Sequence, residues 1–370
     1  MKMHSEIEDL ITSSIGNGNL KLITGLAGTG KTYFLFHELF DRFKSNPDYT
    51  VVDTLGHDQE QLESLLSSCR EANGKHFIIL IDDIFAKDDP ASLFDLSAGK
   101  SNIDVIATTD FTSKYMLVDD ETLIRGRFQN IYFPPVSFSE ALSLGNVKDF
   151  KEYCQKGGLF IPKEECIKKI IKQGRAIKKF RGDYSEKIIG LLNLMLRHCD
   201  KSISFTELQR LSETKLSTHT LIDYFNFLEG SNLFYVMKKE GINEEKNKAY
   251  CVVFYPTDIS FLPDDASFEI KEKSALIAKL YGDSYSITSG YEKQLDVSYV
   301  LRKGNEKVYV SYSGFDGSKE AGVMADVIKD SYPKVVVSSI VAKKWIDEKG
   351  IIHAGLDEIL KYGLKSVLNF

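Results

Sequence analysis

Near its N-terminus the sequence reads Gly25-Leu26-Ala27-Gly28-Thr29-Gly30-Lys31-Thr32. This stretch matches G-x-x-x-x-G-K-T, the pattern of a phosphate-binding loop. Glycines permit positive φ angles, so that successive backbone N–H groups can converge on phosphate oxygens. In such a loop Lys31 contacts the β- and γ-phosphates, and the hydroxyl of Thr32 contacts Mg²⁺.

The loop has the sequence context that the motif requires. Residues 20–24 are typical of a short strand, and residues 32–44 have the apolar periodicity of a helix. The positive end of that helix points at the same phosphates. We therefore expect the eight loop residues, together with Tyr33, to bind a nucleotide.

A second motif follows a continuous apolar run over residues 76–81, which ends at Asp82 and Asp83. A fully apolar strand is typical of the centre of a parallel sheet, and ligands bind beyond the carboxyl ends of such strands. Asp82 is therefore predicted to hold Mg²⁺ together with Thr32. Asp83 has two interpretations, as the group that activates the attacking water or as the cap of the next turn.

Polar residues also follow the strand predicted over residues 102–108. Thr109 or Asp110 could contact the γ-phosphate or the water, or could cap the next segment. Further along, Arg125 and Arg127 flank a glycine before a strand over residues 130–133. They are predicted to contact phosphate, within the chain or as a finger to a neighbouring copy, with an exposed basic turn as the alternative.

The alternation of strands and helices predicts an α/β fold with a parallel P-loop NTPase sheet over residues 1–145. Residues 146–185 read as a lysine-rich helical connector, whose basic side chains form either a solvated face or a nucleic-acid surface. Residues 186–262 suggest three helices and a hairpin, which is the pattern of a winged helix. Residues 263–370 read as a small α/β domain.

Several stretches occur in an order that resembles a known family. They are residues 22–32, residues 79–84, the Arg125-Gly126-Arg127 turn, residues 135–140, residues 153–159 and residues 255–258. The chain resembles a bacterial and archaeal family of AAA-like P-loop ATPases. In that family the C-terminal part combines a winged helix with a domain like the PD-(D/E)xK nucleases.

The resemblance implies ATP on the loop and Mg²⁺ near Thr32 and Asp82. Where the family has Asp-Glu, this chain has Asp82-Asp83, which has a shorter second side chain and favours binding over turnover. In the nuclease-like part, the first strand offers Asp296 or Ser298 as the candidate metal ligand. The next strand, over residues 308–313, contains neither Glu nor Lys. Because one isolated carboxylate cannot assemble a metal-dependent nuclease site, we expect no DNA cleavage by this part.

Composition narrows the partners and the compartment. The chain has 370 residues and a formal charge of −6, which does not favour nonspecific binding to nucleic acid by the whole surface. Its five cysteines form no C-x-x-C pair, and no stretch is apolar enough to span a bilayer. We expect a cytoplasmic protein without a membrane partner.

Three functions are compatible with these patterns. The first is a Mg²⁺-dependent ATPase or nucleotide-controlled switch that acts on an unidentified protein partner or on DNA, as one copy or as a homo-oligomer. The second is a nucleic-acid-binding winged-helix protein that ATP regulates. The third is a scaffold that a nucleotide stabilises and that scarcely hydrolyses ATP.

Overall fold

The computed structural model describes residues 4–17, 20–72, 74–87, 93, 102–112, 128–178, 183–212, 216–242, 251–292 and 295–368. The chain divides into two compact units. Unit 1 comprises Met1–Pro135, Leu159–Tyr184 and Gly230–Asn232, and unit 2 comprises Val136–Gly158, Ser185–Glu229 and Leu233–Phe370. Each unit is described by itself below.

Unit 1 is built on a five-stranded parallel sheet with the order β2-β3-β4-β1-β5. The strands are β1 (Leu20–Thr24), β2 (Tyr49–Asp53), β3 (His76–Ile81), β4 (Ile103–Thr109) and β5 (Phe128–Tyr132). The phosphate-binding loop follows β1, and β4 and β5 flank β1 on its two sides. This strand order with the loop after β1 is a P-loop NTPase fold, as the sequence predicts.

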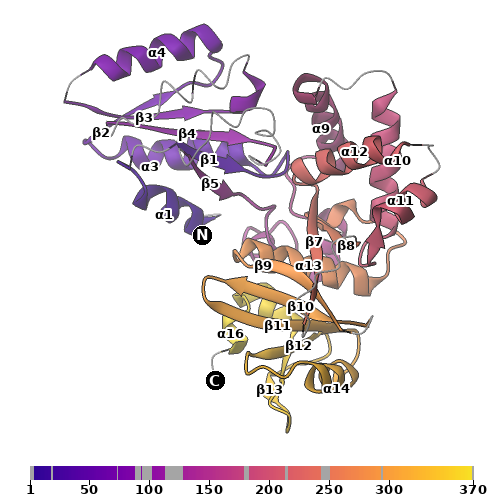
Figure 1. Ribbon diagram of the computed structural model, residues 1–370. Coiled ribbons are helices and arrows are strands. Elements are labelled where there is room, and N and C mark those ends of the chain that lie inside the picture. The colour runs from indigo at the N-terminus through magenta and orange to yellow at the C-terminus, as the bar shows by residue number, and fades with distance from the viewer. Residues whose placement is uncertain are drawn as a thin grey trace. The chain divides into compact units, whose positions relative to one another are not determined.

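Helices cover both faces of this sheet (Figure 1). On one face α4 (Gln59–Glu71) packs its leucines against alternate residues of β1, β3 and β4. On the other face lie α1 (Ser5–Ser13) and the helical segment after the loop. Because both faces are covered, β1 and β4 are buried along their whole length, which explains their apolar sequences.

The helix predicted after the loop is present, but it is not a continuous α-helix. It consists of α2 (Lys31–Tyr33), a π-helical turn η1 (Phe34–Leu39) and α3 (Phe40–Lys44). Four of the six residues in η1 are buried against the sheet. Such wide turns are rare and often lie beside functional sites, as this one does.

Two further helical segments complete unit 1 near the loop. A short 3-10 turn, η2 (Ile84–Ala86), follows β3, and α9 (Lys163–Lys178) begins shortly after Pro162. Within α9, Lys168, Lys169 and Lys172 are exposed while Cys166 and Ile170 are buried. The described part of the lysine-rich stretch is therefore an ordinary amphipathic helix with a solvated basic face.

Unit 2 contains a nine-stranded mixed sheet with the order β13-β14-β12-β11-β10-β9-β7-β8-β6. The strands are β6 (Ile203–Ser204), β7 (Phe234–Gly241), β8 (Cys251–Pro256), β9 (Ser286–Glu292), β10 (Leu295–Lys303), β11 (Glu306–Ser313), β12 (Lys334–Ser338), β13 (Trp345–Ile346) and β14 (Ile352–Gly355). Strand β7 pairs antiparallel with β8 and parallel with β9. The predicted hairpin and the predicted C-terminal domain thus share one sheet.

The helices of unit 2 include three that precede the β7/β8 pair, as a winged helix requires: α10 (Tyr184–Arg197), α11 (Phe205–Leu211) and α12 (Thr218–Gly230). The others are α7 (Phe138–Ser143), α8 (Phe150–Lys156), η3 (Ile259–Phe261), α13 (Phe268–Gly282), α14 (Ser318–Val327), α15 (Leu356–Tyr362) and α16 (Lys365–Leu368). Ser137 caps α7, since its side chain accepts a hydrogen bond from the N–H of Glu140. Among the described residues, no helix has the length and apolar character needed to cross a bilayer.

Candidate functional site

Two glycines of the phosphate-binding loop have conformations and neighbours that only glycine accommodates. Gly28 and Gly30 have φ angles of 85° and 95°. A Cβ on Gly28 would lie 2.4 Å from Ile161, and one on Gly30 would lie 3.0 Å from the ring of Phe160. The backbone N–H of Phe160 also donates to the carbonyl of Gly28 at 2.9 Å. The segment before α9 therefore packs directly on the loop.

Lys31 follows these glycines and is nearly buried, with 6% of its surface exposed. Its ammonium donates to the carbonyls of Gly25 and Leu26 at 2.8 and 2.9 Å. The same Nζ lies 2.8 Å from a carboxylate oxygen of Asp110. The ammonium thus faces the inside of the loop, where a phosphate would lie.

Thr32 and Asp82 come together although 50 residues separate them in the sequence. The hydroxyl of Thr32 lies 3.1 Å from both carboxylate oxygens of Asp82. Thr108 orients this carboxylate, because its hydroxyl donates to Asp82 Oδ1 at 2.5 Å. A hydroxyl and a carboxylate side by side are the hard oxygen ligands that Mg²⁺ prefers, so these residues fit the predicted metal.

Asp83 has a left-handed backbone conformation with φ of 43°, which is uncommon for a residue other than glycine. Its N–H donates to the hydroxyl of Thr108 at 2.9 Å, and its side chain does not cap η2. Burial, and then the charges of Asp110 and Asp82, raise the pKa of Asp83 to about 6. The backbone turn therefore directs this carboxylate toward the site.

The two candidates after β4 behave differently. Thr109 is buried, and its hydroxyl accepts a hydrogen bond from the N–H of Phe111 at 3.2 Å. This bond agrees with the alternative in which Thr109 caps the next segment. Asp110 instead faces the loop and pairs with Lys31. Its second carboxylate oxygen accepts a hydrogen bond from Gln173 Nε2 at 2.9 Å. The structure therefore brings Asp110, rather than the Thr109 hydroxyl, to the phosphate side.

Several site residues carry no sequence motif. Gln173 lies on α9 and also reaches Asp83 Oδ2, at 3.4 Å. Phe160 and Ile161 contact the loop, and Cys166 donates to the carbonyl of Ala27 at 3.2 Å. No pattern in the sequence predicts these contacts, because all four residues lie outside the motifs and outside the segments that carry the family resemblance. Arg125 and Arg127 lie outside the described residues.

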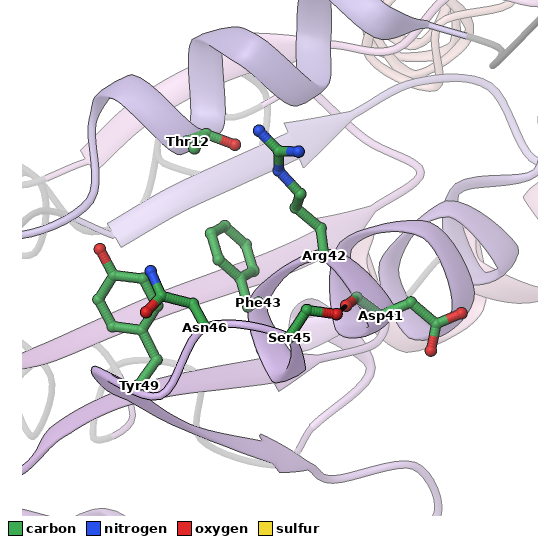
Figure 2. A pocket seen from close by; sticks show the side chains of 7 residues that line it. All are labelled: Thr12, Asp41, Arg42, Phe43, Ser45, Asn46 and Tyr49. Atoms are coloured by element: carbon green, nitrogen blue, oxygen red, sulfur yellow. Dashed lines mark hydrogen bonds between the residues drawn. The ribbon is translucent and has the colours of Figure 1, made fainter.

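Unit 1 has a separate pocket of about 500 Å³ at the other end of the sheet, where β2 begins (Figure 2). It is lined by Thr12, Asp41, Arg42, Phe43, Ser45, Asn46 and Tyr49. Thr12 and Ser45 donate to carbonyls of their own helices, and Arg42 faces Glu8 at 3.6 Å. Its polar groups therefore serve local structure and do not converge on a ligand position.

The described residues contain no group of three or more His, Cys, Asp and Glu side chains arranged to hold a metal. The exposed positions of α12 include Asp223, Asn226 and Glu229. His219 Nδ1 lies 3.0 Å from Asp223 Oδ2. This face of α12 carries acids and no lysine or arginine, so it does not favour contact with nucleic-acid phosphates.

Comparison with protein families and with curated protein sequences finds no match. Among solved structures, a Walker-type ATPase of Pyrococcus abyssi is 12% identical, with 70% of this chain and 95% of that chain covered and a TM-score of 0.42. The Orc1 protein of Aeropyrum pernix, solved with DNA, is 12% identical, with 77% and 94% covered and a TM-score of 0.30. Cdc6p of Pyrobaculum aerophilum is 14% identical, with 76% and 93% covered and a TM-score of 0.30. Similarities this distant assign the chain no substrate and no partner.

Proposed function

We propose that this chain binds Mg²⁺ and ATP on its phosphate-binding loop and acts as a nucleotide-controlled switch with slow hydrolysis. The observation that carries the proposal is the meeting of Thr32 and Asp82 at 3.1 Å beside the buried ammonium of Lys31. Lys31 and Thr32 begin the helix after β1, whereas Asp82 follows β3, so the groups lie far apart in the sequence. Together they offer one cation for phosphate and two oxygen ligands for a metal.

Magnesium would be held by the hydroxyl of Thr32 and the carboxylate of Asp82, with Thr108 fixing the orientation of Asp82. When bound there, Mg²⁺ would neutralise charge on the β- and γ-phosphate oxygens. The exposed ring of Phe160 lies over Gly30 and adds an apolar wall beside the nucleotide position. The loop, Asp82 and Phe160 thus account for phosphate, metal and a hydrophobic contact.

We assign the activation of water to Asp83. Its carboxylate accepts the proton of the water whose oxygen attacks the γ-phosphorus, while the bond to the β–γ bridging oxygen breaks. The side chain is one methylene shorter than a glutamate, so it reaches less far toward the water. Slow turnover, and long residence in each nucleotide state, follow from that shorter reach.

The nucleic-acid-binding alternative has weaker support in the described residues, because the exposed face of α12 is acidic. A nucleotide-controlled switch can act on a protein partner whether or not DNA is also bound. The deciding experiment therefore measures ATP binding and turnover with Mg²⁺, in the presence and absence of duplex DNA.

The control variants are Lys31→Ala, which removes the loop cation, and Lys75→Ala, which removes an exposed lysine elsewhere in unit 1. We expect Lys31→Ala to weaken ATP binding by about 100-fold, since hydrogen bonds to charged groups are among the strongest in proteins. Lys75→Ala should match the parent protein. Undiminished ATP binding by a folded Lys31→Ala variant would overturn the proposal, and stimulation of turnover by DNA would favour the nucleic-acid alternative.

A further inference from the structure

The ammonium of Lys31 has three hydrogens to donate, and three acceptors already surround it. Two are the loop carbonyls of Gly25 and Leu26, and the third is the carboxylate of Asp110 at 2.8 Å. A phosphate that contacts Lys31 must therefore take a hydrogen from one of these three acceptors. The two carbonyls are uncharged, whereas the carboxylate of Asp110 carries a negative charge that repels the phosphate.

The position of Asp110 is set by the sheet. Strand β4 lies beside β1 in parallel, with Thr109 in register with Thr24, and the N–H of Gly25 donates to the carbonyl of Thr109 at 3.3 Å. The residue after Thr109 must therefore lie against the start of the loop. Asp110 is 18% exposed at its side chain, so solvent screens its charge only in part.

Hydrogen bonds on three sides hold Asp110 in this place. Gln173 donates to its second carboxylate oxygen at 2.9 Å, and Asn232 Nδ2 donates to its main-chain carbonyl at 2.9 Å. Two residues later, the N–H of Thr112 donates to the carbonyl of Gly230, the last residue of α12, at 2.7 Å. The backbone of Asp110 thus cannot withdraw without disturbing residues 230–232.

We propose that Asp110 is a built-in substitute for the γ-phosphate, and that its carboxylate makes this site prefer ADP to ATP. The inference rests on the nucleotide site proposed above and adds its specificity. In the ADP state, the β-phosphate can take a hydrogen from one loop carbonyl while Asp110 keeps its own bond to Lys31. In the ATP state, a γ-phosphate oxygen competes with the carboxylate for the same ammonium.

Charge counting supports this preference. Asp82 has a metal to neutralise it, whereas Asp110 has only the ammonium that the γ-phosphate also needs. Asp83 adds a third carboxylate beside them, within electrostatic range of Asp110. Like charges at such separations in a partly buried site repel each other strongly, so the γ-phosphate is the least favourable part of ATP for this site.

The hydrogen bonds of Asp110 also connect the nucleotide state to a part of the chain outside the loop. When ATP does bind, the carboxylate of Asp110 must turn away from Lys31, and the hydrogen bond that it accepts from Gln173 must adjust. Gln173 lies on α9. The substitution of phosphate for carboxylate is thereby linked to α9.

The test measures the dissociation constants of Mg²⁺-ADP and of a Mg²⁺-bound ATP analogue with a methylene bridge between the β- and γ-phosphorus atoms. The full-length parent chain is compared with Asp110→Asn, which removes the charge and keeps the shape. Asp41→Asn, an exposed position on α3 at the far end of unit 1, is the control for net charge. Thermal melting of each variant checks folding, and Asp110→Ser serves if Asp110→Asn does not fold.

We expect the parent to bind ADP more tightly than the ATP analogue. Asp110→Asn should tighten the analogue by about tenfold and change ADP by less than about threefold, because one like charge has gone. Asp41→Asn should leave both constants unchanged. An equal ratio of the two constants in the parent and Asp110→Asn, or weaker analogue binding by the variant, overturns this inference alone. If the parent chain and its variants bind neither nucleotide, the proposed nucleotide site is overturned as well.

Discussion

Carboxylates are used in opposite ways at the loop edge of unit 1 and on the mixed sheet of unit 2. At the loop edge, Asp83 and Asp110 lie close to Asp82 and depend on one ammonium, that of Lys31. Burial and the two neighbouring carboxylates raise the pKa of Asp83 to about 6. This edge of the sheet holds more negative charge than its own cation can balance.

On the mixed sheet, by contrast, Glu240 and Asp296 each have a cation of their own. Glu240 on β7 receives hydrogen bonds from both terminal nitrogens of Arg302 and from Thr288, the latter at 2.7 Å. Burial alone would raise the pKa of Glu240, but these bonds outweigh it and lower the pKa below its ordinary value. The comparison teaches that carboxylates outnumber their cation at the edge where an outside cation and phosphate are expected.

The largest expected effect is on ATP turnover, and it tests whether a carboxylate of the loop edge takes part in the reaction. Replacing Asp83 by Asn keeps the shape of the side chain and removes the group that accepts the proton of water. We expect turnover at saturating ATP to fall by about 100-fold, a typical loss for a general base. Steady-state phosphate release measures it, with nucleotide affinity as the control for binding. Turnover equal to that of the parent would mean that Asp83 has no part in the reaction.

Unit 2 supplies the opposite case, a carboxylate whose loss should cost stability. In Glu240→Gln the bidentate bond to Arg302 loses its charge, so we expect unfolding to become easier by about 1–2 kcal/mol at neutral pH. A group whose pKa is lowered by folding stabilises above its unfolded pKa and stops doing so as the pH falls through its folded pKa. The difference between variant and parent should therefore shrink as the pH falls below the ordinary pKa of glutamate, and it should disappear once the pH is below the lowered pKa of Glu240.

Chemical denaturation at several pH values measures this difference. The matched control is Glu306→Gln, whose exposed carboxylate lies 3.8 Å from Lys365 and should contribute little. A loss in Glu240→Gln that persists unchanged in acid would show that packing, and not the charge, is responsible. A loss as large in Glu306→Gln would remove the distinction between the two pairs.

The sequence predicts the fold of unit 1 well because its strands are short and its central strands are mostly apolar and followed by turn residues. The bounds of β2 and β3 agree with prediction, and β4 is displaced by one residue. Lys21 is a revealing exception within β1. It is fully buried, and its ammonium pairs with the fully buried Asp104 of β4. A buried ion pair across two strands leaves no periodic signal, since each residue looks like a break in its own strand.

The candidate site is predictable only where its chemistry is written in consecutive residues. The loop and Asp82 have fixed motifs, and in the structure the hydroxyl of Thr32 lies beside Asp82. Thr108 shows the limit, because the sequence favours its neighbour Thr109 and only the register of β3 against β4 decides which hydroxyl reaches Asp82. Contacts from α9 depend on how a distant helix packs, which no local pattern specifies.

The smallest expected effect concerns Gln173, whose side-chain amide contacts both Asp83 and Asp110. Gln173 Nε2 lies 2.9 Å from Asp110 and 3.4 Å from Asp83, while its Oε1 is buried with no partner among the described residues. Gln173→Leu removes both donated bonds and also the unsatisfied oxygen. The two changes act on stability in opposite directions, so we expect the free energy of unfolding to shift by less than about 1 kcal/mol.

Turnover should respond more clearly than stability, because Asp83 and Asp110 lose the donor that holds them at a fixed separation. We expect it to fall by about threefold in Gln173→Leu, a loss smaller than that of removing Asp83 itself. Gln173→Glu has nearly the same shape but adds a carboxylate that repels both neighbours, so its loss should exceed that of the leucine variant. Equal turnover in the parent and both variants would mean that the amide does not hold these carboxylates, and that the excess charge at the loop edge is positioned by the sheet alone.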